Sequence, residues 1–212
     1  MSDRWNFLDP KDKSSGRLQF EGSEFDFVRV NLVKNKQIIV CFSVKDEIYD
    51  EIKMSGFYDK YMIITLVKFA QAVSKRRKKF TFFDIGANVG WFSIVFAILF
   101  ENVRVEAFEP NANTMLALSA NREINGLSDQ ISLNEVVLLG ERKAVEEQTN
   151  SFGSQSEFRA VADGAMPIAT TVLSRTLDDY IDQESPVDFL KIDVNGDDFN
   201  ILVGGQDFIR RH

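Results

Sequence analysis

The hydrophobic pattern of the first 79 residues predicts a small unit made of strands and one helix. Two segments rich in β-branched and aromatic residues, 25–33 and 37–44, flank a short polar turn, which is typical of a β-hairpin. Residues 60–73 place apolar side chains at helical spacing, so a helix is predicted there. Residues 1–24 are polar and contain a proline, and we expect them to form a loose peripheral arm.

From residue 80 onward, apolar strand-like segments alternate with helix-like segments. This alternation is typical of an α/β, Rossmann-like fold, in which helices cover both faces of a parallel sheet. Ligands of such sheets bind at the carboxyl ends of the strands. The stretch 140–170 is polar and poorly periodic, so we expect a loop or a lid there. Strands are predicted at 80–86, 103–109, 131–138 and 187–193, and helices at 89–100, 111–124, 176–183 and 196–210.

Composition and charge argue against several classes of protein. The chain has 212 residues, enough for one well-buried domain. Its net charge of −7 argues against a broad electrostatic grip on nucleic acid or anionic lipid. The longest nearly apolar run, 91–100, is far shorter than the roughly 20 residues that span a bilayer. No secretory signal is visible, so we expect a cytoplasmic location and neither a nucleic-acid nor a membrane partner.

Three isolated features have simple structural interpretations. The basic run 75–79 follows a predicted helix, where positive side chains favour the helix dipole and solvate the connection to the next strand. Cys41 is the single cysteine, so it forms no internal disulfide, and its apolar neighbours predict a buried thiol. His212 is the single histidine and the last residue, which argues against a histidine-centred triad or a zinc site.

The segment DIGANVG, residues 84–90, lies where the first strand of the predicted parallel sheet turns into a helix. Gly86 lets the backbone turn sharply and approach a ligand closely. Asn88 suits the N-cap of the helix, and Gly90 permits close packing of the helix on the strand. Because the N–H groups of a helix start lack partners, this loop is predicted to bind a ligand.

The same loop favours one cofactor class over another. A dinucleotide-binding loop carries G-x-G-x-x-G, but Asn88 occupies the second glycine position, and Asp84 would repel a pyrophosphate. A cationic group such as a sulfonium tolerates that acid, which favours S-adenosylmethionine. Glu109 follows Asp84 by 25 residues at the end of the second strand, near the spacing of an acid that binds both ribose hydroxyls. The simpler alternative is that Glu109 caps a loop.

Four motifs in order resemble the FkbM family of S-adenosylmethionine-dependent methyltransferases. They are DIGANVG, FEPN at 108–111, TLDDY at 176–180 and DFLKIDVNGDD at 188–198, and the resemblance spans about residues 56–210. It implies the class I methyltransferase fold and O-methylation of a small hydroxylated acceptor such as a sugar or a natural product. The residues that it assigns to the cofactor are Asp84, Gly86, Ala87, Asn88 and Gly90 at the methionine end, Glu109 at the ribose, flanked by Phe108 and Asn111, and Asn134 and Glu135 near the adenine.

The resemblance also implies a division of the chain. Residues 1–79 would form the substrate side or a cap, and residues 80–212 a domain that binds S-adenosylmethionine. The class I fold continues with three further strands after the fourth strand and its helix, so we expect a C-terminally incomplete sheet. Its fourth strand would then be an open edge through which oligomers can form. The usual D-V-E-G of the family is D-V-N-G here, with Asn195 in place of the acid.

The candidate catalytic residues follow the fourth strand. Methyl transfer from a sulfonium requires alignment of the acceptor oxygen and removal of one proton. Asp193 is the first candidate, as a base or as a ligand for a hard cation. Lys191 is the second, and a salt bridge under the sheet is its alternative role.

Two other functions are weighed against an O-methyltransferase. The chain could be a cofactor-binding domain that is catalytically silent, or one that needs a partner chain. Methylation of an amino group in nucleic acid is disfavoured, because the (D/N)-P-P-(Y/F) loop typical of such enzymes is absent after the fourth strand.

Overall fold

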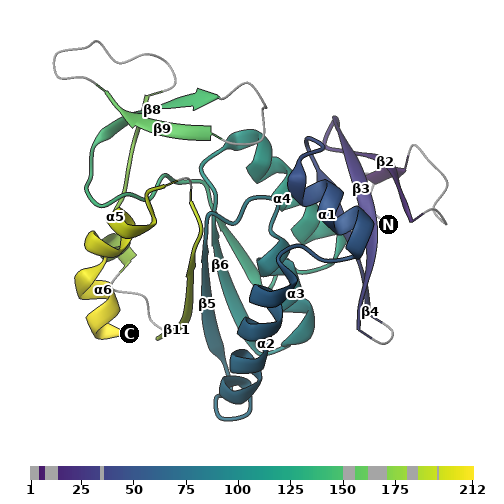
Figure 1. The fold of residues 1–212 in the computed structure, drawn as a ribbon, viewed down its shortest axis with the longest axis horizontal. Coiled ribbons are helices and arrows are strands. Elements are labelled where there is room, and N and C mark those ends of the chain that lie inside the picture. Colours follow the sequence, from purple (N-terminus) through teal and green to yellow (C-terminus); the bar gives the residue numbers. More distant parts are fainter. Residues whose placement is uncertain are drawn as a thin grey trace.

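The computed structural model describes residues 5–7, 14–33, 36–149, 156–161, 171–180, 186–194 and 196–212. Within these ranges the chain forms an antiparallel four-stranded sheet, a parallel four-stranded sheet and a small antiparallel three-stranded sheet. In Figure 1 the parallel sheet stands upright between the N-terminal sheet on the right and the C-terminal helices on the left, and the small sheet lies above its upper end.

The N-terminal sheet contains β1 (Trp5–Phe7), β2 (Ser15–Phe20), β3 (Ser23–Val33) and β4 (Lys36–Phe42), in that order. The strands β3 and β4 confirm the predicted hairpin. The prediction of a loose N-terminal arm is wrong for β2, because Leu18 and Phe20 are fully buried in the core. Glu21 and Gly22 both have a positive φ, of 49° and 85°, as a tight hairpin turn of type I′ requires.

Two helices follow β4. The first, α1 (Glu47–Ser55), has no counterpart among the predicted elements, and the second, α2 (Lys60–Ser74), confirms the predicted helix. Each begins at an aspartate whose carboxylate accepts a backbone N–H of the first turn: Asp46 caps α1 and Asp59 caps α2. Because α1 buries only Tyr49 and Ile52, its apolar period is too weak to stand out in the sequence.

The parallel sheet has the strand order β11-β5-β6-β7 and forms the centre of the molecule. Its strands are β5 (Phe80–Ile85), β6 (Val103–Phe108), β7 (Ile131–Asn134) and β11 (Val187–Ile192), which confirms the four predicted strands. The strand β7 ends four residues before its predicted end, because Val137 and Leu139 form backbone hydrogen bonds with Arg175 instead. Among the described residues β11 pairs only with β5 and is therefore an edge of the sheet, as expected.

Helices cover both faces of this sheet (Figure 1). Phe80, Phe82 and Val105 belong to one hydrophobic core with α3 (Trp91–Leu99) and α4 (Ala112–Ile124). Phe83 and Ile85 point to the other face and pack with the C-terminal elements: the 3₁₀ turn η1 (Leu177–Tyr180), α5 (Asp198–Val203) and α6 (Gln206–Arg211). In the part of the chain that the structure describes, no helix is long and apolar enough to cross a membrane.

Two predicted helices differ from the observed elements. The helix predicted over 176–183 is only the turn η1, and residues 181–185 lie outside the described residues. The helix predicted over 196–210 is divided into α5 and α6 by Gly204 and Gly205. A Cβ atom at Gly204 would lie 2.5 Å from the carbonyl oxygen of Gly140, so the helices separate where another backbone segment passes very close.

Two strands of the small sheet lie within residues 140–170, the stretch for which a loop or a lid is expected, and the third follows it. The sheet contains β8 (Ala144–Thr149), β9 (Ser156–Ala160) and β10 (Thr171–Leu173), with β8 in the middle. The expectation of a plain loop is therefore wrong for β8 and β9, and residues 150–155 and 162–170 of that stretch lie outside the described residues. The strands are short and mostly polar, and Val145 is buried while few of its neighbours are, so no clear alternation marks them in the sequence.

The turn that follows β5 is packed against the end of β11. Gly86 has a φ of 71°, and a Cβ atom on it would lie 2.0 Å from the carbonyl oxygen of Asp193. The backbone N–H of Asp193 donates to the carbonyl of Ile85 at 3.1 Å, which holds the two strand ends together. Glycine is therefore required at residue 86 by the packing of the protein itself.

The substitution Gly86→Ala should destabilise the fold by at least about 3 kcal/mol, because its Cβ overlaps a backbone carbonyl and the residue must keep a left-handed conformation. Gly126→Ala is the matched control. Gly126 has a φ of 69° but no atom within 4 Å of the added Cβ, so only the conformational cost of about 1–2 kcal/mol is expected. Urea unfolding of both variants measures the difference, and equal losses would contradict the packing argument.

Candidate functional site

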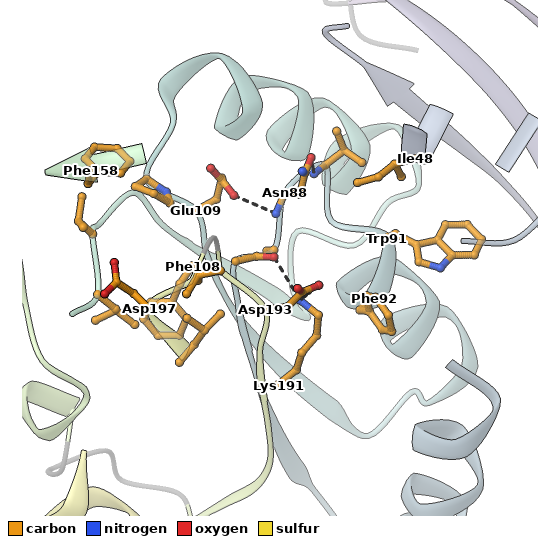
Figure 2. Close-up of a pocket in the computed structure, with 18 of the residues that line it drawn as sticks. Ile48, Asn88, Trp91, Phe92, Phe108, Glu109, Phe158, Lys191, Asp193 and Asp197 are labelled. Carbon is orange, nitrogen blue, oxygen red and sulfur yellow. Dashed lines mark hydrogen bonds and ion pairs between the residues drawn. The ribbon is translucent and has the colours of Figure 1, made fainter. Parts of the chain in front are cut away.

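A cavity of about 780 Å³ opens at the carboxyl ends of β5, β6 and β11 (Figure 2). Its volume falls in the range of small-molecule sites, roughly 300–1,000 Å³, and its position is the usual one for ligands of parallel sheets. Its walls come from the loop after β5, the ends of β6 and β11, the segment that contains α1, residues 136–139 and the strand β9.

The loop after β5 forms the floor of the cavity with backbone atoms. The N–H groups of Gly86 and Ala87 both donate to the carbonyl of Phe108, at 3.0 and 2.9 Å, so the loop folds over the end of β6. All three residues line the cavity, together with Asn88. The register of β5 and β6, which pairs Ile85 with Phe108, fixes the place of this fold.

The start of α3 differs from the prediction in two details. Asn88 is not the N-cap: it lies in a turn with a φ of 51°, its side chain accepts the N–H of Val89, and the helix begins at Trp91 after Gly90. Gly90 does not line the cavity. A Cβ atom there would lie 2.1 Å from the Leu118 side chain, so Gly90 permits close packing of α3 against α4 rather than against the strand.

Glu109 is a nearly buried carboxylate in the cavity wall. Its Oε2 accepts the backbone N–H of Asn88 and its Oε1 accepts that of Asn111, each at 3.0 Å, and the first contact is visible in Figure 2. Burial raises the pKa of Glu109 to about 7, while these two hydrogen bonds act in the opposite direction. Each oxygen keeps a further lone pair, so Glu109 can accept hydrogen bonds from two neighbouring hydroxyl groups of a ligand.

Asp84 and Lys191 form a buried ion pair beneath the cavity. They lie opposite each other on β5 and β11, and the Lys191 Nζ is 3.0 Å from the Asp84 Oδ1. The hydroxyl of Ser93 donates to the other carboxylate oxygen at 2.6 Å. Asp84 is fully buried and does not line the cavity, whereas Lys191 does. Asp84, which is predicted at the methionine end of the cofactor, thus contacts Lys191 in the structure.

Lys191 joins several parts of the site. Its ammonium group donates to the carbonyl of Gly86 at 3.1 Å, lies 3.7 Å from the Asp193 carboxylate and is 5.1 Å from the centre of the Phe92 ring. The sequence left open which face of the sheet Lys191 points to. Its side chain lies on the α3 side, where it makes the predicted salt bridge and also reaches the cavity.

Asp193 provides a carboxylate that a ligand can reach. Its side chain is 56% exposed and lines the cavity next to Lys191 (Figure 2). Asp197 also lines the cavity, whereas the Asp198 carboxylate accepts the N–H of Val194 and closes the turn before α5. Asn195, where the family has an acid, lies outside the described residues.

Besides Asp84 and Gly90, three further predicted cofactor residues do not line the cavity. Asn111 caps α4 through Thr114, and its amide donates to Glu147 at 2.6 Å. The Asn134 amide donates to the Glu106 carboxylate at 3.1 Å. Glu135 is exposed beyond the end of β7 and does not line the cavity.

Several cavity residues have no counterpart among the predicted site residues. Tyr58 lies between α1 and α2, and its carbonyl accepts the Trp91 indole N–H at 3.0 Å, which links the N-terminal segment to α3. Long-range contacts of this kind leave no signal in the sequence. The further lining residues that were not predicted include residues 45–48, Phe92, residues 136–139, Phe158 and Arg159.

Acidic side chains outnumber basic ones around the cavity. Five carboxylates line it, those of Asp46, Glu47, Glu109, Asp193 and Asp197, against the three cations of Lys45, Arg159 and Lys191. The described residues contain no group of three or more His, Cys, Asp or Glu side chains that could hold a metal ion. The cavity therefore suits a ligand with positive charge and hydroxyl groups better than a pyrophosphate.

The comparison with known families identifies the domain around this cavity. The Methyltransferase FkbM domain matches residues 84–212, which include the loop after β5, Glu109 and the end of β11. The chain belongs to the FkbM methyltransferase family. The cavity described above is therefore the candidate active site of a methyltransferase domain, and its N-terminal wall precedes the matched residues.

Comparisons with individual proteins say less about this chain than the family match does. No curated protein matches the chain significantly. One solved structure that matches is that of PH0793, a proposed transferase from Pyrococcus horikoshii, with 18% sequence identity and a TM-score of 0.34. The match covers 58% of this chain and 45% of that chain, so this chain spans less than half the length of that protein.

Lys191→Met should destabilise the fold by about 3–5 kcal/mol, because it leaves the Asp84 carboxylate buried without a cation. The double variant Asp84→Asn/Lys191→Met removes both charges and should recover most of the loss. Urea unfolding of the two single variants and the double variant forms a complete cycle. A double variant as unstable as Lys191→Met would show that the loss does not come from the buried Asp84 carboxylate left without its cation.

Proposed function

We propose that this chain is an S-adenosylmethionine-dependent O-methyltransferase that acts on a hydroxylated small molecule. The observation that carries the proposal is the position of Glu109, a carboxylate at the end of the second strand of the sheet, held by two backbone N–H groups and open to the cavity. Membership of the FkbM methyltransferase family supports the reaction class.

The residues of the cavity fit this cofactor. Glu109 would accept hydrogen bonds from the two ribose hydroxyls. Phe108 and the apolar residues 136–139 form a wall next to Glu109 that suits the adenine ring. The surplus of carboxylates favours a sulfonium and an ammonium group and would disfavour the pyrophosphate of a dinucleotide.

The cofactor supplies the methyl group when it is bound, and the protein must position the acceptor and manage one proton. Asp193 is the carboxylate placed for this task, because it is exposed at the cavity and lies at the end of β11. In the proposed mechanism it accepts the proton of the acceptor hydroxyl as the oxygen is methylated. The ammonium group of Lys191 lies 3.7 Å from this carboxylate and helps to position it at the end of β11.

The acceptor side of the cavity is proposed to be the wall formed by the N-terminal segment. Tyr58 and residues 45–48 line this side and combine an aromatic ring with charged and polar groups. Such a wall suits a polar acceptor such as a sugar, whose hydroxyls form hydrogen bonds while its carbon face packs on aromatic rings.

A second function is a domain that binds the cofactor but needs a partner chain to be active. The observation that favours it is the open edge of β11, which pairs only with β5 in the described part of the chain and carries Lys191 at the site. Methyl transfer by the purified chain to any member of a panel of sugars and other hydroxylated compounds would reject it. Binding of S-adenosylhomocysteine without transfer would support it.

The affinity for S-adenosylhomocysteine should fall as the pH is lowered from about 8 to about 6, by roughly tenfold, because Glu109 has a pKa of about 7 and must be charged to accept two hydrogen bonds. The affinity falls on acidification because the charged form of Glu109 binds the ligand, and protonation near pH 7 removes that charge. Glu109→Gln should bind more weakly at pH 8 and show little pH dependence. Isothermal titration measures both proteins, and an unchanged pH dependence in the variant would exclude Glu109 as its source.

Asp193→Asn should reduce turnover by about 100-fold or more and leave the affinity for S-adenosylhomocysteine nearly unchanged, because the side chain keeps its shape and loses only its charge. Asp197→Asn is the control, since it removes a second cavity carboxylate that has no role in this mechanism. Initial rates with the best acceptor of the panel measure the effect. Normal turnover by Asp193→Asn would show that another group receives the proton.

A further inference from the structure

Residues 60–79 differ sharply in charge from the rest of the chain. This segment, which contains α2 and the basic run after it, has seven Lys and Arg residues and no Asp or Glu. The other 192 residues contain 18 basic and 32 acidic residues. A concentrated positive surface therefore exists on a protein whose net charge is negative, and the net charge alone does not exclude an anionic partner.

The helix α2 presents large apolar side chains to solvent. Only Ile63 and Ala70 are buried, while Tyr61 is 86% exposed and Phe69 is 64% exposed. At 3.6 residues per turn, Tyr61 falls opposite the two buried residues, and Ile64 and Phe69 fall on the two flanks of that outer side. Lys68 and Lys75 share that outer side, so it carries both exposed apolar groups and cations.

The cations of this segment are mostly without anionic partners. Arg77 pairs with Asp188 at 3.1 Å, which agrees with the structural role expected for the basic run. In the described part of the chain, no ion pair involves the other basic residues of the segment, which are Lys60, Lys68, Lys75, Arg76, Lys78 and Lys79, and all of them are exposed. Their charge is therefore available to a partner.

We propose that α2 and the run 75–79 dock on the surface of an anionic lipid bilayer. The headgroups of such a bilayer attract the lysines and arginines, and its interface accepts exposed apolar and aromatic side chains. Nucleic acid also attracts cations, but a duplex backbone offers no apolar counterpart to Ile64 and Phe69. With 15 residues, α2 is about 22 Å long, which is too short to span the hydrocarbon core of a bilayer. In the proposed complex the helix therefore lies in the plane of the interface.

The proposed surface, named here the α2 surface, is separate from the catalytic chemistry. It runs from Lys60, two residues after Tyr58 of the cavity wall, to the start of β5, at the end of the strand that is remote from the cavity. In Figure 1 the loop after α2 forms the lowest point of the molecule. Docking would bring the N-terminal wall of the cavity close to the headgroups, and the proposal does not depend on methyl transfer.

Co-sedimentation with vesicles tests the proposal. The protein should bind vesicles of phosphatidylcholine with about 30 mol% phosphatidylglycerol at least about tenfold more tightly than vesicles of phosphatidylcholine alone. Raising the salt to about 0.5 M, where charges more than about 4 Å apart are screened, should weaken this binding strongly. Equal binding to the two vesicle types, or binding to neither, would overturn the proposal.

Two variants assign the binding to the α2 surface. Replacing Lys75, Arg76, Lys78 and Lys79 by Gln should reduce the affinity for the anionic vesicles at least about tenfold, while Arg77 is kept for its pair with Asp188. Replacing Tyr61 and Phe69 by Ser should also weaken binding, because the apolar contribution is lost. Both changes affect exposed side chains, and circular dichroism checks that the fold is intact.

The matched control removes four cations elsewhere. Replacing Arg17, Lys143, Arg210 and Arg211 by Gln changes the net charge equally and should leave most of the vesicle binding in place. Loss of binding in this control, or normal binding in the variant of the run 75–79, would overturn the proposal. Tighter binding to duplex DNA than to the anionic vesicles would identify a nucleic-acid surface and would overturn it as well.

Discussion

The ammonium group of Lys191 is the contact on which the functional end of the sheet depends. It reaches the Asp84 carboxylate of the neighbouring strand, the carbonyl of Gly86 in the loop and, more distantly, the Asp193 carboxylate. A buried ion pair is costly to form and even more costly to break, because either partner alone is a buried charge. The pair therefore adds little to net stability, and its main effect is to fix two strand ends and a loop relative to each other.

This placement explains how three separate segments produce one cavity. Gly86 can fold beneath the carbonyl of Asp193 because it lacks a Cβ, and its N–H reaches the end of β6 at Phe108. Glu109, the residue after β6, then accepts the N–H of Asn88 from the same loop. Each contact uses backbone atoms on at least one side, so the geometry is set mainly by the path of the chain. Glu109 and Asp193 are the carboxylates that directly follow β6 and β11 and line the cavity.

The sequence was most informative where local chemistry and burial coincide. The apolar strands around Phe82 and Val105 are buried on both faces and were located within one residue of their observed limits at the ends that form the site. Glu109 could be found because its distance from Asp84 follows from one strand–helix–strand unit. The capping role of Asn88 was predicted wrongly, since asparagine suits both an N-cap and a left-handed turn, and only the contacts of the folded loop select the turn.

The features that could not be predicted are those that depend on distant contacts. Nothing around Asp84 or Lys191 in the sequence shows that their side chains meet, because the register of two strands about 100 residues apart decides it. The same holds for Tyr58, which enters the cavity wall through a hydrogen bond from the indole of Trp91.

That hydrogen bond has a consequence for specificity. Trp91 belongs to the residues matched by the family and Tyr58 to the segment before them. The matched domain thus carries the residues proposed for the cofactor. Through Trp91 of α3 it also positions the cavity wall that contains Tyr58, which lies before the matched residues. A change in the N-terminal segment can therefore alter the wall proposed for the acceptor while the contacts of Glu109 and Lys191 stay the same.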